Sequence, residues 1–403
     1  MNDRPIKVLA IIETLGRGGA ETLLVHLAPS LFEVGVHLEV AHLTPPGTLT
    51  DELQARGVAV HDLHGPAPWR ADVLVPRLAR VIRQREPDIV HAHLFFAGLH
   101  TGLLPHWIHR GPRVLSLHCP DYIEQPATTL QKRLRKQLHR LILHHRMTSL
   151  VAVSQAVAKH YQKEMQLDAI EVIYNALPNL DFQPGASECR EATKSLHGLR
   201  EKVPLIACVG RFSPQKGHAH LIEAARLLRN RFPEIQIAIV GSGPLEPRYR
   251  QWIADRSLTD VVKLVPPMPH RDLMALLEAS DIFVMPSLEG EGFGIAAAES
   301  MALARPTIVT AIEALRELVT DGKNGLVVPP ADPTGLADAI GRLLQDPEHA
   351  HKLGSKAKIS AQKRFSAEIL APEWARFYRR ILTESIGQPY EDADRRVRNT
   401  KNR

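Results

Sequence analysis

The sequence predicts an α/β protein built from two doubly wound domains, each around a parallel sheet. Short apolar segments rich in β-branched residues recur along the chain, and amphipathic helical segments separate them. Strands that alternate with helices in this way form parallel sheets through right-handed crossovers. The alternation loosens once, near residue 182, and then resumes. The 403 residues therefore divide into two halves, each about the size of one such domain.

The first half begins with a strand and a glycine-rich turn. Residues 6–12 are short and almost entirely apolar, which is typical of a strand covered on both faces. The turn at residues 16–19 follows, and residues 20–32 carry apolar side chains at helical spacing. Further strands of this half are expected at residues 37–42, 88–91, 114–118 and 150–153.

A second set of strands follows a looser, proline-containing stretch. These strands are expected at residues 205–209, 235–240, 261–265, 282–285 and 307–310. We assign residues 1–182 to an N-terminal domain and residues 183–367 to a C-terminal domain. A helix over 368–387 is expected to cross back to the N-terminal domain, and the polar tail 388–403 to be disordered. Because parallel sheets bind ligands beyond the carboxyl ends of their strands, the expected site is a cleft between the domains.

Composition excludes several classes of protein. The chain is 44% hydrophobic and 23% charged, which is a globular composition, and no apolar run is long enough to span a membrane. Three cysteines cannot build a disulfide framework, and the N-terminus lacks the pattern of a secretory signal, so we expect a cytoplasmic protein. The net charge of +6 is shared by both halves and aromatic residues are only 5%, so we expect no nucleic-acid partner.

The first glycine turn offers a binding site for a phosphate or a sugar. A dinucleotide fingerprint requires three spaced glycines, but Glu21 stands at the third position after Gly16 and Gly18, which disfavours a dehydrogenase. Backbone N–H groups at a helix start, without a Cβ in the way, suit a phosphate. A plain tight turn is the alternative.

Charged residues follow two strands of the second half. Arg211 and Lys216 come after the strand at 205–209, where two cations can neutralise a diphosphate leaving group. Glu291 precedes a glycine turn, and Glu299 lies eight residues later in the next helix. Two carboxylates beside free N–H groups can bind many hydroxyls, as on a sugar and a ribose. Solvated loop cations and surface glutamates are the alternatives for each residue taken alone.

With these motifs in order, the chain resembles the GT-B glycosyltransferases of glycosyltransferase family 4. The resemblance runs from Val8 to about Tyr378. The matching stretches are residues 18–21, 87–93, 116–118, 151–154, 172–175, 209–217, 240–244 and 291–299. The GT-B fold consists of two Rossmann-like domains that face each other across a cleft, so the resemblance implies the architecture that the strand pattern also predicts.

The resemblance also implies a role for each matching residue. Arg211 and Lys216 match the residues that hold the donor diphosphate, Glu291 the acid that contacts the transferred sugar, and Glu299 the acid on the ribose. Phe293, Gly294 and Ile295 match the segment whose backbone N–H groups meet sugar and phosphates. His118 matches the histidine that reaches the donor sugar from the N-terminal domain, and Gly18 and Gly19 match the glycine loop near phosphates and acceptor.

The activity that the resemblance implies is transfer of a sugar from a UDP- or GDP-sugar to a sugar or lipid-linked acceptor. Retention of anomeric configuration, independence of metal and other cofactors, and a pathway to polysaccharide, lipopolysaccharide or glycolipid are expected. A GT-B nucleotide-sugar epimerase and a non-catalytic sugar-nucleotide-binding protein are the alternatives. The sequence departs from the family at Glu313-Ala314, where a glycine pair is usual, and this places a carboxylate near the expected phosphates.

Two further patterns have competing interpretations. His91 and His93 face one side of a strand, either as a metal-binding pair or, as we favour, as packed strand-end residues. Residues 130–146 form a basic amphipathic helix with leucines at helical spacing. This helix either lies on an anionic membrane, as a peripheral attachment at the inner face of the cell membrane, or packs its leucines on the N-terminal sheet.

Overall fold

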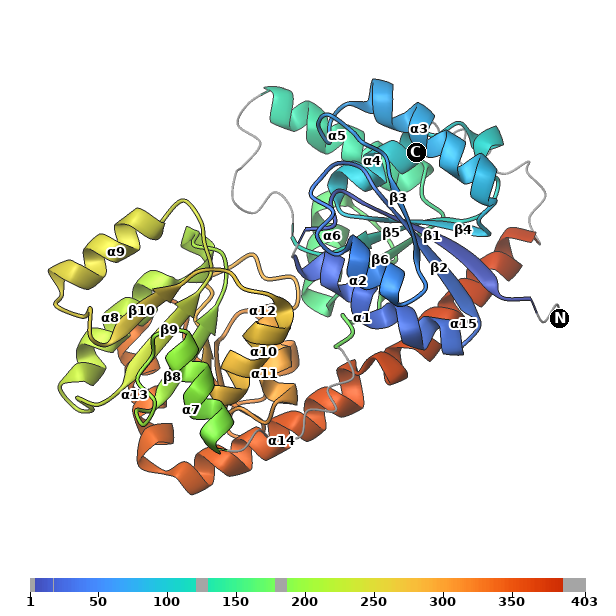
Figure 1. Ribbon diagram of the computed structural model, residues 1–403. Helices are drawn as coiled ribbons and strands as arrows, with labels where there is room; N and C mark the ends of the chain where they lie inside the picture. The colour runs from blue at the N-terminus through green and yellow to red at the C-terminus, as the bar shows by residue number, and fades with distance from the viewer. Residues whose placement is uncertain (1–3, 17, 121–129, 178–186, 387–403) are drawn as a thin grey trace.

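Two parallel sheets dominate the computed structural model, which describes residues 4–16, 18–120, 130–177 and 187–386 (Figure 1). The first sheet has seven strands in the order β3-β2-β1-β4-β5-β6-β7, and every pairing is parallel. Its strands are β1 (Ile6–Ile12), β2 (Val36–His42), β3 (Ala59–Asp62), β4 (Ile89–His93), β5 (Arg113–Leu117), β6 (Ser149–Ala152) and β7 (Glu171–Val172).

Helices cover both faces of this N-terminal sheet. They are α1 (Gly19–Glu33), α2 (Thr50–Ala55), α3 (Ala71–Arg85), α4 (Phe95–Leu103), α5 (Leu130–His145) and α6 (Gln155–Met165), with a short 3₁₀ turn, η1 (His106–Ile108). The central strands are buried on both faces, as a doubly covered parallel sheet requires. The edge strands β3 and β7 are only half-buried and very short, which explains why their sequences carry no strand signal.

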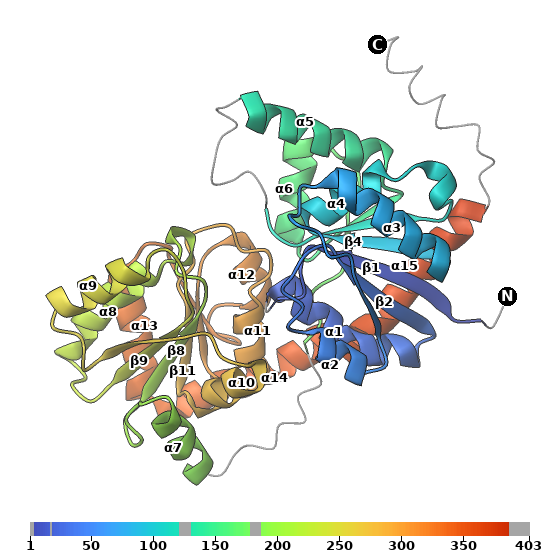
Figure 2. The ribbon, with the colours of Figure 1, turned by 45° about the horizontal axis from the view of Figure 1, so that its top comes forward.

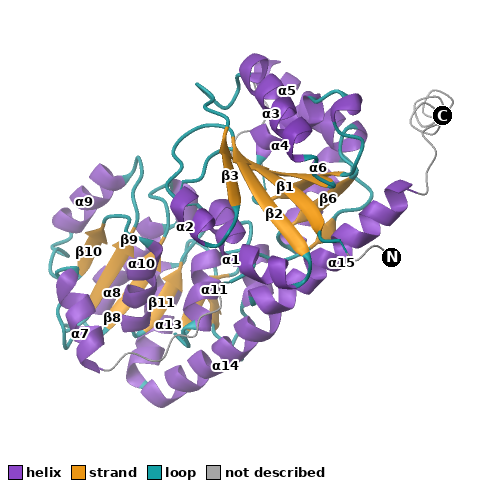
Figure 3. Cartoon of the chain, turned by 45° about the vertical axis from the view of Figure 1, so that its right-hand side comes forward, coloured by secondary structure: helices purple, strands orange, loops and turns teal. Residues whose placement is uncertain are grey.

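The C-terminal domain repeats this plan around six strands in the order β10-β9-β8-β11-β12-β13. The strands are β8 (Leu205–Val209), β9 (Gln236–Val240), β10 (Val262–Val265), β11 (Ile282–Met285), β12 (Thr307–Thr310) and β13 (Leu326–Val328). The helices are α7 (Ser187–Leu196), η2 (Pro214–Lys216), α8 (His218–Arg229), α9 (Glu246–Asp255), α10 (His270–Ala279), α11 (Ile295–Ala302), α12 (Glu313–Leu318) and α13 (Pro333–Gln345). Figure 3 shows the two sheets with their helical layers.

Two long helices at the end of the described chain connect the domains. α14 (Pro347–Phe365) packs on α11 of the C-terminal domain, and α15 (Ala367–Ile386) packs on α1 of the N-terminal domain (Figure 2). The chain turns between them at Ser366, where Leu177 donates its N–H to the carbonyl of Phe365 over 2.7 Å. The last helix therefore covers the N-terminal sheet, while the predicted boundary near 182 and the tail 388–403 lie outside the described residues.

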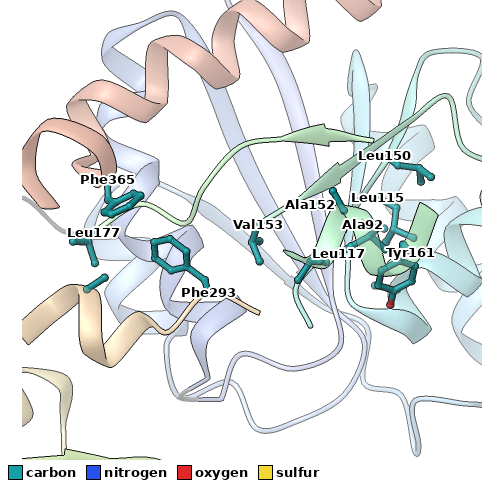
Figure 4. Packing of buried hydrophobic residues seen from close by; sticks show 14 of the residues in the cluster. Ala92, Leu115, Leu117, Leu150, Ala152, Val153, Tyr161, Leu177, Phe293 and Phe365 are labelled. Atoms are coloured by element: carbon teal, nitrogen blue, oxygen red, sulfur yellow. The ribbon is translucent and has the colours of Figure 1, made fainter. Parts of the chain in front are cut away.

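One hydrophobic cluster is continuous between the two domains. It joins Leu115 and Val153 of the N-terminal domain to Leu177, Phe293 and Phe365 at the junction (Figure 4). The ring of Phe293 lies 5.1 Å from that of Phe365, centroid to centroid, in an edge-to-face arrangement. The architecture confirms the predicted class of two doubly wound parallel-sheet domains. Within the described ranges, no helix combines the length and the apolar character needed to cross a bilayer.

Candidate active site

The order of the strands determines where each sheet can form a ligand-binding crevice. β1 pairs with β2 on one side and with β4 on the other, so the chain reverses its direction across the sheet at β1 and β4. β8 likewise pairs with β9 and β11. Doubly wound sheets bind ligands at the carboxyl ends of such strands, because the loops there diverge and leave a crevice. Both crevices of this protein open into one cleft.

The cleft has a volume of about 840 Å³, which is in the range of a site for a nucleotide-sized ligand. All ten residues that the sequence analysis singled out for the site line it: Gly18, Gly19, His118, Arg211, Lys216, Glu291, Phe293, Gly294, Ile295 and Glu299. Glu313 is exposed at the start of α12 and is not among the lining residues, so the expected carboxylate near the phosphates is not found there.

A partly buried ion pair lies at the C-terminal wall of the cleft. Lys216, the last residue of η2, donates a 2.5 Å hydrogen bond from Nζ to Oε1 of Glu291, and the Ser287 hydroxyl donates to the same oxygen over 2.7 Å. The side chain of Glu291 is only 7% exposed, against 29% for Lys216. Removing one partner of a buried pair leaves an uncompensated charge, so these two side chains act as a unit.

Glu299 is held by a histidine that the sequence analysis did not identify. His270, the first residue of α10, places Nε2 2.8 Å from Oε1 of Glu299. The ring of His270 also lies 5.1 Å from that of His26 on α1, across the junction of the domains. Burial, followed by the proximity of His270, lowers the pKa of His26 to about 3, so His26 is neutral at physiological pH.

Glycines bring the two walls of the cleft into direct contact. An added Cβ at Gly292 would overlap the backbone carbonyl of His118 in the opposite domain. A Cβ at Gly19 would lie only 2.6 Å from Cδ1 of Ile295, also across the cleft. Gly294 has a different requirement, because its φ of +93° starts α11 in a conformation that favours glycine. Two of these glycines therefore permit the approach of the domains.

A carboxylate of the C-terminal domain caps a helix of the N-terminal domain. Glu317 on α12 accepts hydrogen bonds from the backbone N–H of Gln155 over 2.9 Å and of Ala156 over 2.7 Å, at the start of α6. The hydroxyl of Tyr174 donates to the same carboxylate over 3.1 Å. Unpaired N–H groups and the positive end of the helix dipole favour a negative charge at this position. This contact between the domains joins residues about 160 positions apart, and no local pattern indicates it.

The N-terminal wall contains His118, which follows β5 and is half-buried. Burial lowers its pKa to about 4, so the imidazole is neutral at pH 7. His91 and His93 lie behind it with their rings 4.3 Å apart, which agrees with the packed pair that we favoured. In the part of the chain that the structure describes, no group of three or more potential ligands is arranged to hold a metal ion.

Comparison with known proteins agrees with this geometry. Residues 17–178 match the family model described as Glycosyltransferase Family 4, and residues 190–360 match the model described as Glycosyl transferases group 1. The α-D-kanosaminyltransferase of Streptomyces kanamyceticus is 30% identical over 313 residues, which are 76% of this chain and 79% of that protein. A D-inositol 3-phosphate glycosyltransferase of Pseudarthrobacter chlorophenolicus is 30% identical over 376 residues, 86% of each chain.

Solved structures share the fold at lower sequence identity. Anabaena HepE, in complex with UDP-glucose, matches with a TM-score of 0.80 and 21% identity over 93% of this chain and all of that one. Sucrose-phosphate synthase from Thermosynechococcus elongatus matches with a TM-score of 0.74.

Two parallel-sheet domains that face a common cleft are the architecture of the GT-B fold. The chain belongs to the family 4 glycosyltransferases, so it is a transferase of glycosyl groups.

Proposed function

We propose that this enzyme transfers a sugar from a UDP- or GDP-sugar to a hydroxyl acceptor, with retention and without a metal. The observation that carries the proposal is the convergence on one cleft of two cations, two carboxylates and His118, contributed by both domains. Arg211 and Lys216 suit the diphosphate, Glu291 and His118 the transferred sugar, and Glu299 the ribose. HepE in complex with UDP-glucose and a GDP-mannose-dependent relative of Corynebacterium glutamicum support such a donor.

The cations supply the stabilisation that the leaving group needs. When the anomeric C–O bond breaks, its electron pair passes to the diphosphate and positive charge develops on the sugar. Lys216 is paired with Glu291 in the structure, and a diphosphate would compete with this carboxylate for the ammonium. Preorganised charges in a site closed to water stabilise such a transition state strongly. We therefore propose that Arg211 and Lys216 take the part that a divalent metal takes in other transferases.

Retention is proposed to proceed by attack on the face that the leaving group vacates. The three carboxylates of the described cleft are each engaged: Glu21 accepts from the Thr14 hydroxyl over 3.2 Å, Glu291 pairs with Lys216, and Glu299 is bonded to His270. We therefore assign none of them as a nucleophile. The acceptor oxygen then forms the new bond to the anomeric carbon, while its proton passes to the leaving phosphate oxygen.

The first test is a thermal-shift screen of UDP- and GDP-sugars, with and without EDTA. A donor at 100 times its Kd stabilises the folded state by about 2.7 kcal/mol, which raises the Tm by several degrees. We expect one nucleotide class to raise the Tm equally with and without EDTA. Release of nucleoside diphosphate that depends on added acceptor would then separate transfer from epimerisation or mere binding. A requirement for magnesium in either assay would overturn the proposed mechanism.

We further propose that α5 attaches the enzyme to an anionic membrane, where a lipid-linked acceptor would be found. The apolar residues of α5 fall into two groups in the structure. Ile142 is buried against the domain, whereas Leu134, Leu138 and Leu141 are 61%, 42% and 56% exposed. The exposure of these three leucines supports the membrane interpretation over the alternative that they pack on the sheet. Figure 2 shows α5 on the outer side of the N-terminal domain. Basic residues on the same helix would each add about 1 kcal/mol near an anionic surface.

The membrane prediction is tested with vesicles and a leucine variant. We expect the enzyme to sediment with vesicles rich in anionic lipid, less so at high salt, and the combined Leu134→Asn, Leu138→Asn and Leu141→Asn variant to lose this binding. The leucines are preferable to the cations as targets, because Lys136 is bonded to Glu164 and Arg135 stacks on Phe95.

The matched control exchanges three comparably exposed apolar residues on other helices, α7, α14 and α15. Leu196, Ile359 and Ile369 are 79%, 52% and 51% exposed, and their change to asparagine should leave vesicle binding unaltered. Equal binding to neutral vesicles, or no binding to anionic ones at low salt, would contradict the membrane proposal without touching the proposed reaction.

A further inference from the structure

A chain of three histidines runs from the cleft into the N-terminal domain. Nδ1 of His93, at the end of β4, lies 3.0 Å from Nε2 of His118. The ring of His91 lies 4.3 Å from that of His93, tilted by 31°, and His91 bonds to the hydroxyls of Tyr378 and Ser116, each over 2.8 Å. His91 and His93 are both 2% exposed, whereas His118 lines the cleft. The contact between His93 and His118 thus connects a fully buried side chain to the proposed sugar site.

All three imidazoles are neutral at physiological pH. Burial lowers the pKa of His91 to about 3 and that of His118 to about 4, and burial together with the two neighbouring imidazoles lowers the pKa of His93 well below its usual value. A neutral imidazole carries one N–H donor and one acceptor nitrogen. In the 3.0 Å contact, one ring must therefore donate and the other accept.

The surroundings of His93 determine which ring donates. Its Nε2 is buried and has no hydrogen-bond partner among the described residues. A proton on Nε2 would bury an unpaired N–H, at a cost of about 1–3 kcal/mol, and such orphaned donors are rarer than orphaned acceptors. A proton on Nδ1 instead donates to His118. His118 then accepts at Nε2 and carries its own proton on Nδ1.

We propose that His93 is a positioning residue that holds His118 in the Nδ1–H tautomer, so that His118 offers the ligand a hydrogen-bond donor and not a base. The assignment of a ligand to His118 rests on the proposed function, but the tautomer does not. A donor at this position suits a sugar hydroxyl or a developing negative charge. Because His118 would then present no basic nitrogen to the ligand, the proton of the acceptor hydroxyl would pass to the phosphate oxygen of the leaving group.

The test measures the tautomer directly in the ligand-free protein. Nitrogen-15 NMR distinguishes protonated from unprotonated ring nitrogens, and the His118→Gln variant identifies the signals of His118. We expect Nδ1 of His118 to be protonated in the unmodified enzyme and the preference to be lost in His93→Leu. A protonated Nε2 of His118 in the unmodified enzyme would overturn the proposal, whatever the enzyme transfers.

Two further variants separate positioning from mere packing. His91→Gln is the matched control, because His91 is as buried as His93 and packs against its ring but makes no bond to His118. The signals of His118 should be unchanged in this variant. His93→Leu should lower kcat about 10-fold with little change in donor Kd, the effect of one hydrogen bond. His93→Asn, which restores a donor near the position of Nδ1, should recover most of this loss, and equal losses in both variants would contradict the role.

Discussion

Replacing Glu291 with glutamine or alanine is expected to lower kcat by on the order of 10²–10³-fold, while the affinity for the nucleoside diphosphate changes little. The carboxylate faces the position proposed for the transferred sugar, and an interaction made mainly in the transition state affects turnover more than binding. The nucleotide would keep the other contacts proposed for it, with Glu299 and Arg211, which line the same cleft. Steady-state kinetics and calorimetric titration with nucleoside diphosphate measure the two quantities separately.

The ion pair between Lys216 and Glu291 allows a second test with a double variant. Because Lys216 bonds to Glu291 over 2.5 Å, the two side chains are not independent. Lys216→Met alone should also lower kcat by about 10²-fold, and the double variant should lose far less than the product of the two single losses. Glu289→Gln is the matched control, since Glu289 is an exposed residue of the same loop. Strictly multiplicative losses, or unchanged turnover in Glu291→Gln, would contradict the assignment.

The sequence was sufficient for the central strands and for the residues that follow them. β1, β8 and β11 are short, apolar and buried on both faces, so their signal is local. The glycines and charges that follow such strands must lie at the carboxyl edge of a parallel sheet, whatever the rest of the chain does. The strands β3, β7 and β13 escaped prediction because they are two to four residues long and lie at the edges of their sheets.

Contacts between distant segments could not be predicted in this way. The bond of Glu317 to the start of α6 and the bond of His270 to Glu299 depend on how whole elements pack, and periodicity contains no information on that packing. The pattern of residues 130–146 showed a leucine stripe, but only the packing of α5 decides that Ile142 is buried and Leu134 exposed. The spacing of His91 and His93 was likewise visible, whereas the bond of His93 to His118, which follows the neighbouring strand β5, depends on how β4 and β5 pair.

Gly292→Ala is expected to lower kcat by about 10²-fold or more by keeping the domains apart. The structure has no room for a Cβ at Gly292, because it would lie 1.8 Å from the backbone carbonyl oxygen of His118 in the opposite domain, and a backbone atom cannot swing aside as a flexible side chain can. The φ of Gly292 is not among the positive values, so alanine is compatible with the C-terminal domain by itself. A displacement of about 1 Å between reacting groups is enough to cost 10²-fold in rate.

Donor affinity distinguishes this steric effect from a direct contact with the ligand. If Gly292 serves closure, Gly292→Ala should bind nucleoside diphosphate almost as well as the unmodified enzyme, because Arg211, Lys216 and Glu299 all belong to the C-terminal domain. With donor bound, small-angle X-ray scattering should then show a larger radius of gyration for the variant than for the unmodified enzyme.

The control is Gly322→Ala. Its φ of +67° makes alanine cost about 1–2 kcal/mol of stability, yet a Cβ there meets no atom within 4 Å, so turnover should be unchanged. Loss of nucleotide binding in Gly292→Ala would instead assign this glycine to the donor site, and normal turnover would show that the contact with His118 is not needed for the reaction.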